Sequence, residues 1–225
     1  MEHGSREFQK AIDYLCREIQ NDSIQAGGRL PAERVIAEEL QISRNSTREA
    51  LRSLEHMGII ESVRGSGNYF TGNISKSFSE MIRLLILVKL VTEAEICDFR
   101  RTMDQSVCLS IIRRGDFDLS EVERVLSEKT ETVEEEIEKD HRFHDLLTQV
   151  SDNRFWIELM NAVCDVYREW IDIILRRAER ETKEKFHAAH GKILAALKDK
   201  DFPRCAEAID EHYDIIDQAF KQAEV

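Results

Sequence analysis

The stretch GGRLPAERVIAEELQISRNSTREALRSLEHMGIIESVRGSGNYF, from Gly27 to Phe70, predicts how the first third of the chain folds. Pro31 opens a predicted helix, because the missing N–H of proline costs nothing in a first helical turn. After the short turn QIS, a second predicted helix begins near Ser43, a residue type that favours the N-cap, and stops at Gly58. Two helices joined by so short a turn form a helix-turn-helix.

Two short runs after Gly58, IIESV and NYF, flank the tight turn RGSG. Runs of this kind around a glycine-rich turn predict a β-hairpin, which would be the wing of a winged helix. Before the quoted stretch, apolar residues recur on one helical stripe between Glu7 and Ile24, which predicts one further helix.

The helix from Ser43 carries a basic stripe. Arg44, Arg48 and Arg52 are spaced i, i+4 and i+8 and therefore share one face. A lone exposed arginine is usually just solvated, but Arg64 in the wing turn adds a fourth cation that converges on the same region. Arginine can bind phosphates or fork onto guanine, so this pattern predicts a DNA-binding surface.

The charge of the whole chain, −12, would by itself argue against nucleic acid as a partner. The acidic excess is unevenly spread, however. Residues 1–73 carry nine Lys/Arg against eleven Asp/Glu, whereas the remainder carries 23 against 33. The negative charge therefore belongs mainly to the second part of the chain.

Glycine marks the boundary between two domains. Seven of the nine glycines lie at or before Gly72, and the long remainder has one proline and apolar residues at every third or fourth position. Such a pattern predicts a helical bundle. The sequence thus predicts a mainly α protein with a winged helix-turn-helix domain at residues 1–72, a linker at 73–77 and an all-helical domain at 78–225.

Several protein classes can be set aside. The N-terminus MEHGSREFQK is charged, and the apolar run LLILV is bounded by Arg83 and Lys89, so neither a signal peptide nor a membrane span fits. The five cysteines are scattered without a C-x-x-C pair, which argues against a disulfide framework and a thiolate zinc site. We expect a soluble, cytoplasmic protein that does not act at a membrane.

The stretch from Gly27 to Phe70 closely resembles the winged-helix signature of the GntR family of bacterial transcription regulators. The resemblance implies that both helices and the wing tip contact double-stranded operator DNA. The implied contact residues are Arg34, Arg44, Asn45, Ser46, Thr47, Arg48, Arg64 and Gly65. The family normally has a small residue, often glycine, where Gln41 stands, so we expect a slightly altered turn without loss of binding.

Histidines in the second domain point to a different chemistry. When the helical faces are drawn, Asp140 and His144 lie on a buried stripe, and His190 and His212 lie on the buried stripes of two later helices. His141, in contrast, is predicted to point toward water, as is His187.

An inward cluster of this kind predicts a metal site. A single inward histidine is more often a satisfied core residue, but burying several polar groups without partners is costly. Neutral imidazoles together with a carboxylate suit Zn, Ni, Mn or Fe. We therefore predict a divalent transition metal bound by Asp140, His144, His190 and His212.

The metal site leaves two functions open. Glu138-x-x-His141 and Glu184-x-x-His187 match the i, i+3 spacing of di-iron carboxylate bundles, which would make the second domain a metal-dependent oxidoreductase fused to a DNA-binding module. Both pairs fall on polar stripes, which argues against that alternative. The other function is a sensor in which the metal helps to hold a small anionic effector.

A second resemblance favours the sensor. FRRTMDQSVCLSI, DHRFHDLLTQVSDN, AHGKILAAL and AIDEHYDII look like the FCD effector domain of the FadR subfamily of GntR regulators. In metal-binding members the ligands are an Asp, a His four residues later and two further His, which match the four residues of the predicted site. Arg100 aligns with a common family arginine that would pair with an effector carboxylate, although a structural ion pair with Asp104 fits equally well. Asn153 would contact the effector or act as a helix cap.

These observations predict a regulator without catalytic activity. We expect a homodimer that binds a pseudo-palindromic operator, with repression, the commoner behaviour in the family, as its mode. A small carboxylate-type metabolite bound near the metal would control operator affinity.

Overall fold

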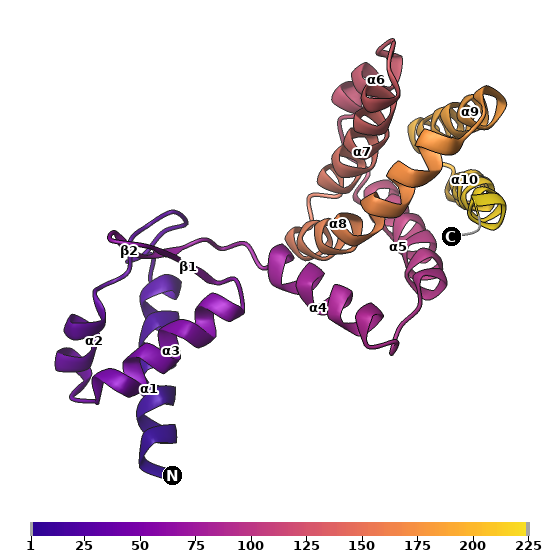
Figure 1. Cartoon of the computed structure of the whole chain (residues 1–225). Coiled ribbons are helices and arrows are strands. Elements are labelled where there is room, and N and C mark those ends of the chain that lie inside the picture. The colour runs from indigo at the N-terminus through magenta and orange to yellow at the C-terminus, as the bar shows by residue number, and fades with distance from the viewer. Residues whose placement is uncertain (1, 224–225) are drawn as a thin grey trace. The chain divides into compact units, whose positions relative to one another are not determined.

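The computed structural model describes residues 2–223. The chain divides into two compact units, with the division between Phe78 and Ser79. This division falls inside a helix, α4 (Ser75–Leu87), and the predicted linker at 73–77 therefore includes the first turn of that helix. Figure 1 labels the elements of both units.

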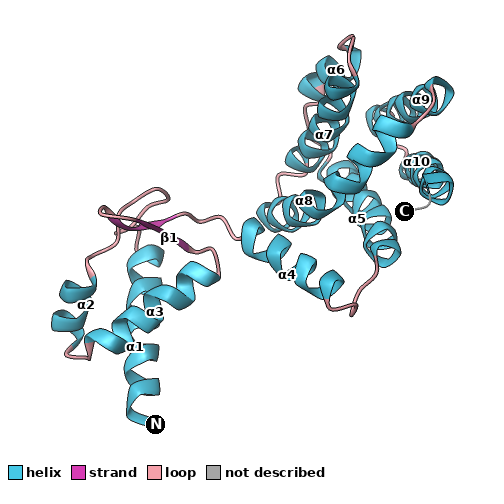
Figure 2. Ribbon diagram, viewed as in Figure 1, coloured by secondary structure: helices cyan, strands magenta, loops and turns pink. Residues whose placement is uncertain are grey.

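The N-terminal unit is a winged helix. Its elements are α1 (Glu2–Gln20), α2 (Glu33–Leu40), α3 (Arg44–His56), β1 (Ile60–Val63) and β2 (Gly67–Phe70). The two strands pair antiparallel, with Ile60 opposite Phe70 and Val63 opposite Gly67. They are the only strands among residues 2–223, as the colouring of Figure 2 shows. The predicted helix-turn-helix and wing are confirmed.

Apolar side chains from every element of this unit meet in one small core. Leu15, Ile36, Leu54 and Ile60 are almost fully buried, and α1 and α2 both pack against α3. Burying one such side chain contributes about 1.5–3 kcal/mol. The core therefore fixes α3 against its neighbours and determines which face of that helix remains exposed.

The C-terminal unit is an all-helical bundle, as predicted. After α4 it contains α5 (Glu93–Arg114), α6 (Ser120–Ser127), α7 (Val133–Val150), α8 (Arg154–Arg177), α9 (Arg180–Lys198) and α10 (Phe202–Ala223). Within this unit α10 packs against α9 and α5, and α7 packs against α8 (Figure 1).

Local sequence sets where these helices begin. Thr92 with Glu95 and Thr132 with Glu135 form capping boxes at the starts of α5 and α7. Such boxes satisfy N–H groups that have no partner inside the helix. Further along α7, Phe143 and its neighbour His144 are buried in the core.

Candidate DNA-binding surface and metal centre

The start of α3 is held in place by a side-chain cap. The Ser43 hydroxyl accepts a hydrogen bond from the Ser46 N–H (3.1 Å), as its N-cap preference predicts. The turn before it contains Gln41, whose φ of 54° and ψ of 47° lie in the left-handed region. Glycine adopts this conformation without strain, which explains why a small residue is expected at this position.

Four of the predicted contact residues are exposed near this turn. Arg44 and Asn45 lie in the first turn of α3 and face solvent. Arg48, one turn further on, forms a bidentate ion pair with Glu33 of α2, with N···O distances of 2.9 and 2.8 Å. Arg34 pairs with Glu38, one turn along α2, at 3.0 Å. Two of these exposed arginines, Arg34 and Arg48, are therefore already paired with a carboxylate.

The wing tip is exposed as predicted. Arg64 and Gly65 both face solvent, and Gly65 has a φ of 78°, which favours glycine. The tight turn between β1 and β2 therefore places a cation at the end of the hairpin.

Ser46 and Thr47 do not belong to this exposed surface, which corrects the sequence-based prediction. Thr47 is fully buried and its hydroxyl donates to the Ser43 carbonyl oxygen (3.1 Å). Ser46 is 5% exposed, and its hydroxyl donates to the Glu7 carboxylate of α1 (2.9 Å). Both hydroxyls are used inside the protein, so their role is to hold the start of α3.

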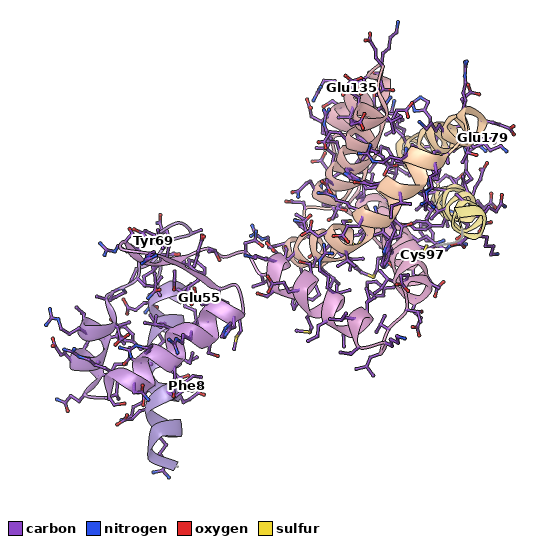
Figure 3. All side chains as sticks on the ribbon, in the orientation of Figure 1. Phe8, Glu55, Tyr69, Cys97, Glu135 and Glu179 are labelled. Atoms are coloured by element: carbon purple, nitrogen blue, oxygen red, sulfur yellow. The ribbon has the colours of Figure 1, made fainter. Side chains whose placement is uncertain are left out.

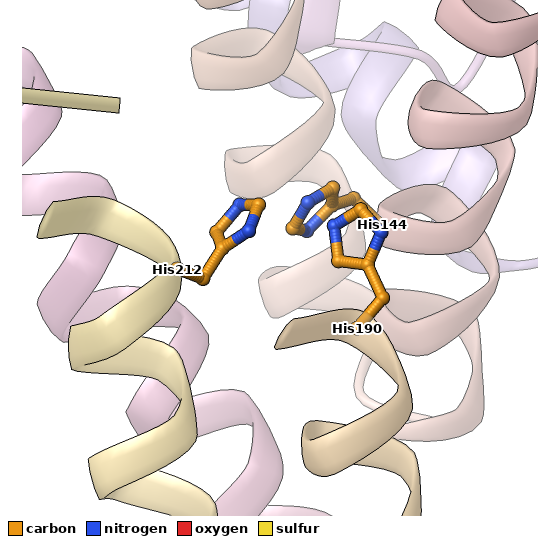
Figure 4. A group of neighbouring side chains, drawn as sticks. All are labelled: His144, His190 and His212. Atoms are coloured by element: carbon orange, nitrogen blue, oxygen red, sulfur yellow. The ribbon is translucent and has the colours of Figure 1, made fainter. Parts of the chain in front are cut away.

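The three predicted histidine ligands converge in the C-terminal unit. His144, His190 and His212 come from α7, α9 and α10, and Figure 4 shows their rings turned toward one another. Each of the three residues is at most 5% exposed, and their candidate ligand atoms all lie within 4.8 Å of one another. Asp140 borders this group, with its Oδ1 3.4 Å from Nε2 of His190.

The chemistry of this cluster fits a metal ion. Nδ1 of His144, Nε2 of His190 and Nδ1 of His212 are buried and have no hydrogen-bond partner among the described residues. Burial and the neighbouring imidazoles hold the pKa of His190 and of His212 well below the ordinary value, which keeps both rings neutral. Neutral buried imidazoles with a free lone pair are what a divalent transition metal requires.

A second buried group lies beside the histidines. Asp104 accepts a hydrogen bond from the Tyr213 hydroxyl (2.7 Å), and its Oδ2 lies 3.5 Å from Nδ1 of His144 and 3.9 Å from Nε of Arg100. Arg100 is 4% exposed, and its guanidinium lies 4.3 Å from the centre of the Tyr167 ring. The ion pair with Asp104 is therefore present, while Nε of Arg100 makes no hydrogen bond.

Asn153 has the capping role. Its side-chain oxygen accepts hydrogen bonds from the N–H groups of Phe155 and Trp156 at the start of α8 (3.0 and 3.3 Å). Asn153 is exposed and is not a member of the histidine cluster. Of the two roles expected for Asn153, the geometry supports the helix cap.

A cavity of about 720 Å³ borders the histidine cluster at His190 and Asp140. Its wall includes Asp140 and His190, together with Lys139, Lys183 and His187. The volume is typical of small-molecule sites. Lys183 already pairs with Glu136 (2.6 Å), and the Lys139 ammonium donates to the Glu128 carbonyl oxygen (2.6 Å).

The di-iron arrangement finds no support in this geometry. His187 and Glu184 are exposed, as their polar stripe predicts. His141, however, does not point to water. Its side chain is 13% exposed and its Nε2 lies 3.1 Å from the Asp172 carboxylate of α8. Neither Glu-x-x-His pair joins the buried histidine cluster.

Each of the two units matches a known protein family. A family model described as bacterial regulatory proteins of the gntR family matches residues 8–70, and a model of the FCD domain matches residues 95–215. The chain belongs to the GntR family. GntR regulators with an FCD domain are transcription regulators that bind DNA, and they are not enzymes.

Individual GntR relatives extend this result. The HTH-type transcriptional regulator LutR of Bacillus subtilis (strain 168) is 30% identical over 155 residues, which is 67% of this chain and 71% of that protein. A putative L-lactate dehydrogenase operon regulatory protein of Escherichia coli (strain K12) is 29% identical over 66% of this chain and 60% of its own length. The solved structure of Streptococcus agalactiae GntR superposes with a TM-score of 0.68 at 21% identity, covering 93% of this chain and 98% of that one.

This GntR protein has no helix among its described residues that is long and apolar enough to cross a membrane.

The carboxylate partners of the arginines were not predicted from the sequence, although Glu33 can be seen there close to Arg34. Asp104 was also not predicted as a neighbour of His144. The one sequence pattern that involves Asp104 is R-x-x-M-D, and this spacing suggested Asp104 as a partner for Arg100 alone.

Proposed function

We propose that this GntR regulator represses transcription by binding a pseudo-palindromic operator as a homodimer, and that a small carboxylate bound beside a metal ion controls this binding. The observation that carries the proposal is the convergence of three buried imidazoles next to a cavity, where Nε2 of His190 and Nδ1 of His212 have no hydrogen-bond partner among the described residues. A site that only stabilised the fold would need no cavity at its edge. An operator-binding protein works where the chromosome lies, which in bacteria is the cytoplasm.

The DNA-binding surface consists of the exposed members of the predicted set. Arg44, Asn45 and Arg48 on α3 would enter the major groove, where arginine forks onto guanine and asparagine onto adenine. Arg34 on α2 and the wing tip at Arg64 and Gly65 would contact the backbone phosphates. The Arg48 side chain is 51% exposed beside Glu33, so its guanidinium would exchange this carboxylate for a DNA acceptor on binding.

The metal would be held by His144, His190 and His212, with Asp140 as the carboxylate ligand beside His190. Zn, Ni, Mn and Fe all suit three imidazoles and one carboxylate. When bound, the ion supplies a positive charge that attracts an anionic effector. Asp104 would orient His144 from behind, as acceptors commonly do for metal-ligating histidines.

The effector would occupy the cavity and reach the metal at its Asp140 and His190 wall. A carboxylate suits a site with a cation at its centre, and Arg100 provides a second buried cation near His144. The name of one relative refers to an L-lactate dehydrogenase operon, and lactate is a small carboxylate. L-lactate is therefore the first compound to test.

The homodimer would form through α4. Met81, Leu84 and Leu87 on this helix are 56%, 56% and 77% exposed, followed by Val88 and Leu90 at 52% and 72%. Large apolar side chains that are this exposed along one helix suit a protein–protein interface. A second copy of the chain is the partner that a two-fold symmetric operator requires.

Effector binding would act through an equilibrium between two arrangements of the bundle. A ligand that binds one arrangement more tightly shifts the population toward it, and the operator affinity follows by linkage. The metal ligands come from three helices, so small movements of α7, α9 and α10 would accompany binding.

The experiment is an operator titration. Duplexes that bind the metal-loaded protein are selected from a random-sequence pool, and affinity is then measured by fluorescence anisotropy with and without L-lactate and with the metal removed by a chelator. We expect a specific duplex to be recovered, and its affinity to change on adding the carboxylate. A specific duplex whose affinity responds neither to a panel of small carboxylates nor to metal removal would contradict the sensing part, while the DNA-binding part would stand.

A further inference from the structure

A third chain segment extends the sheet of the wing. The Gly27 N–H donates to the Phe70 carbonyl oxygen (2.7 Å), the Phe70 N–H donates to the Gly28 carbonyl oxygen (2.9 Å), and the Leu30 N–H donates to the Asn68 carbonyl oxygen (2.8 Å). Arg29 stands directly opposite Tyr69 in this antiparallel bridge. The residues just before α2 are therefore held rigidly along β2.

Side-chain alternation decides where Arg29 points. Leu30 is buried in the core of the unit, and successive residues of an extended segment face opposite sides. Arg29 is exposed and shares the outer face of the sheet with Tyr69, which is labelled in Figure 3, and with Gly67 two residues before it. The Arg29 side chain thus runs over the root of the wing turn.

Gly67 leaves room for this side chain. A Cβ atom at Gly67, where φ is 127°, would lie 3.0 Å from Nε and 3.3 Å from Nη2 of Arg29. Contacts that short would require the guanidinium to move. The absence of a side chain at Gly67 therefore lets the guanidinium lie flat on the hairpin, close to the turn that carries Arg64.

The charge of Arg29 is not compensated. Arg34 and Arg48 each have a carboxylate within 3.0 Å, whereas no carboxylate of the described residues lies within ion-pair distance of Arg29. Glu61 shares the outer face of the sheet, but it stands opposite Tyr69 on the other strand and forms no ion pair with Arg29 in the described part of the chain. A positioned arginine without a counter-ion is suited to bind an anion.

We propose that Arg29 is a further DNA-contacting residue, which binds a backbone phosphate beside the wing and is positioned for this by Gly67. The proposal rests on the proposed operator binding of the N-terminal unit. A phosphate is the expected partner because the guanidinium lies on the wing rather than on α3, and phosphate contacts fix orientation without reading sequence.

The test compares Arg29→Gln with Arg17→Gln. Arg17 is an exposed arginine on α1 of the same unit, so its replacement removes the same charge away from the wing. Affinity for a mixed-sequence duplex is measured by fluorescence anisotropy at several NaCl concentrations. One lost phosphate contact makes the slope of log K against log salt shallower by about 0.9, and we expect this for Arg29→Gln but not for Arg17→Gln.

Three outcomes are informative. A shallower slope with reduced affinity for every duplex supports the proposal. Equal slopes for the two variants overturn it while leaving operator binding intact. If the wild-type protein binds neither this duplex nor any duplex from the random-sequence pool, the proposed function fails as well.

A measurement on the wild-type protein does not depend on the folding of a variant. Phenylglyoxal modifies accessible arginines, and mass spectrometry then reports each site with and without the mixed-sequence duplex. We expect the duplex to protect Arg29 and to leave Arg17 as reactive as before. Equal reactivity of Arg29 in both samples would overturn the proposal.

Discussion

Nδ1 of His144 lies 3.5 Å from Oδ2 of Asp104, so that a carboxylate of α5 faces an imidazole of α7 inside the C-terminal unit. Burial raises the pKa of Asp104, but His144, Arg100 and the Tyr213 hydroxyl outweigh it and lower the value to about 2. The carboxylate is therefore ionised at neutral pH. It can hold the imidazole in the orientation that a metal requires.

Replacing this carboxylate should weaken metal binding. Asp104→Asn keeps the shape of the side chain but removes the charge that faces His144, and losses of about 10–100-fold in metal affinity are typical of such changes. Affinity is measured by competition with a chelating dye. Asp98→Asn, at an exposed position on the same helix, is the control and should bind like the wild type. Equal affinity of Asp104→Asn and the control would remove Asp104 from the site.

The histidine cluster can be tested by metal content. His190→Ala and His212→Ala each remove a buried imidazole, and we expect both variants to be purified with little transition metal. His187→Ala is the matched control, because His187 lies on the same helix three residues before His190 but is exposed. Elemental analysis of the wild-type protein and the three variants measures the transition metal bound per chain. Full metal content in either core variant would contradict the ligand assignment.

The metal-free protein should lose stability as the pH falls below about 6.5. Burial holds the pKa of His190 and of His212 well below 6.5 in the folded protein, whereas the unfolded chain has the ordinary value. Below that pH the unfolded chain takes up protons that the folded protein does not, so the free energy of unfolding falls. Above pH 6.5 both states are neutral and the effect vanishes. The slope of the free energy of unfolding against pH approaches ~1.4 kcal/mol per pH unit for each histidine.

Urea denaturation of the chelator-treated protein between pH 7.5 and 5 measures this slope. The double variant His190→Gln, His212→Gln should show a clearly smaller dependence in the same range. Asp104 contributes outside this window, because its lowered pKa adds stability that is lost only as the pH falls toward 2. A slope that the double variant leaves unchanged would assign the effect to other groups.

Arg48 should matter for DNA binding and little for folding. Arg48→Ala removes the guanidinium that is expected to fork onto a base, and we predict at least a roughly tenfold loss of affinity for the selected operator duplex. The control is Arg124→Ala, which removes an exposed arginine with two carboxylate partners from the C-terminal unit. Circular dichroism should show the same fold for both. Unchanged operator affinity for Arg48→Ala would exclude Arg48 from the contact surface.

Gln41→Gly should stabilise the N-terminal unit. Gln41 has a φ of 54°, a conformation that costs a residue with a Cβ about 1–2 kcal/mol, while glycine loses about 0.5–1 kcal/mol more entropy on folding. The net gain in the free energy of unfolding is expected to be roughly 0.5–1 kcal/mol. Gln41→Ala keeps the Cβ and should show no such gain. Denaturation curves in which the glycine variant is no more stable than the alanine variant would contradict this.

The sequence predicted local features well and long-range partners poorly. The cap at Ser43 and the inward histidines follow from spacing along single helices, which the sequence displays directly. Asp104 and Tyr213, in contrast, meet across 109 positions of the chain, and Ser46 is buried against Glu7, which lies 39 positions earlier. Only the packing of separate helices brings such residues together. The contact prediction for Ser46 and Thr47 failed for that reason.

The three histidines come from helices that begin as far apart in the chain as Val133 and Phe202. An ion bound to them would link these helices as a cross-link does, and α10 could not detach without releasing it. In a cell short of the metal, α10 would detach more often and expose cleavage sites to proteases, since proteolysis follows the population of opened states. The lifetime of the regulator, and with it the expression of its target genes, would then depend on metal supply even when no metabolite is present.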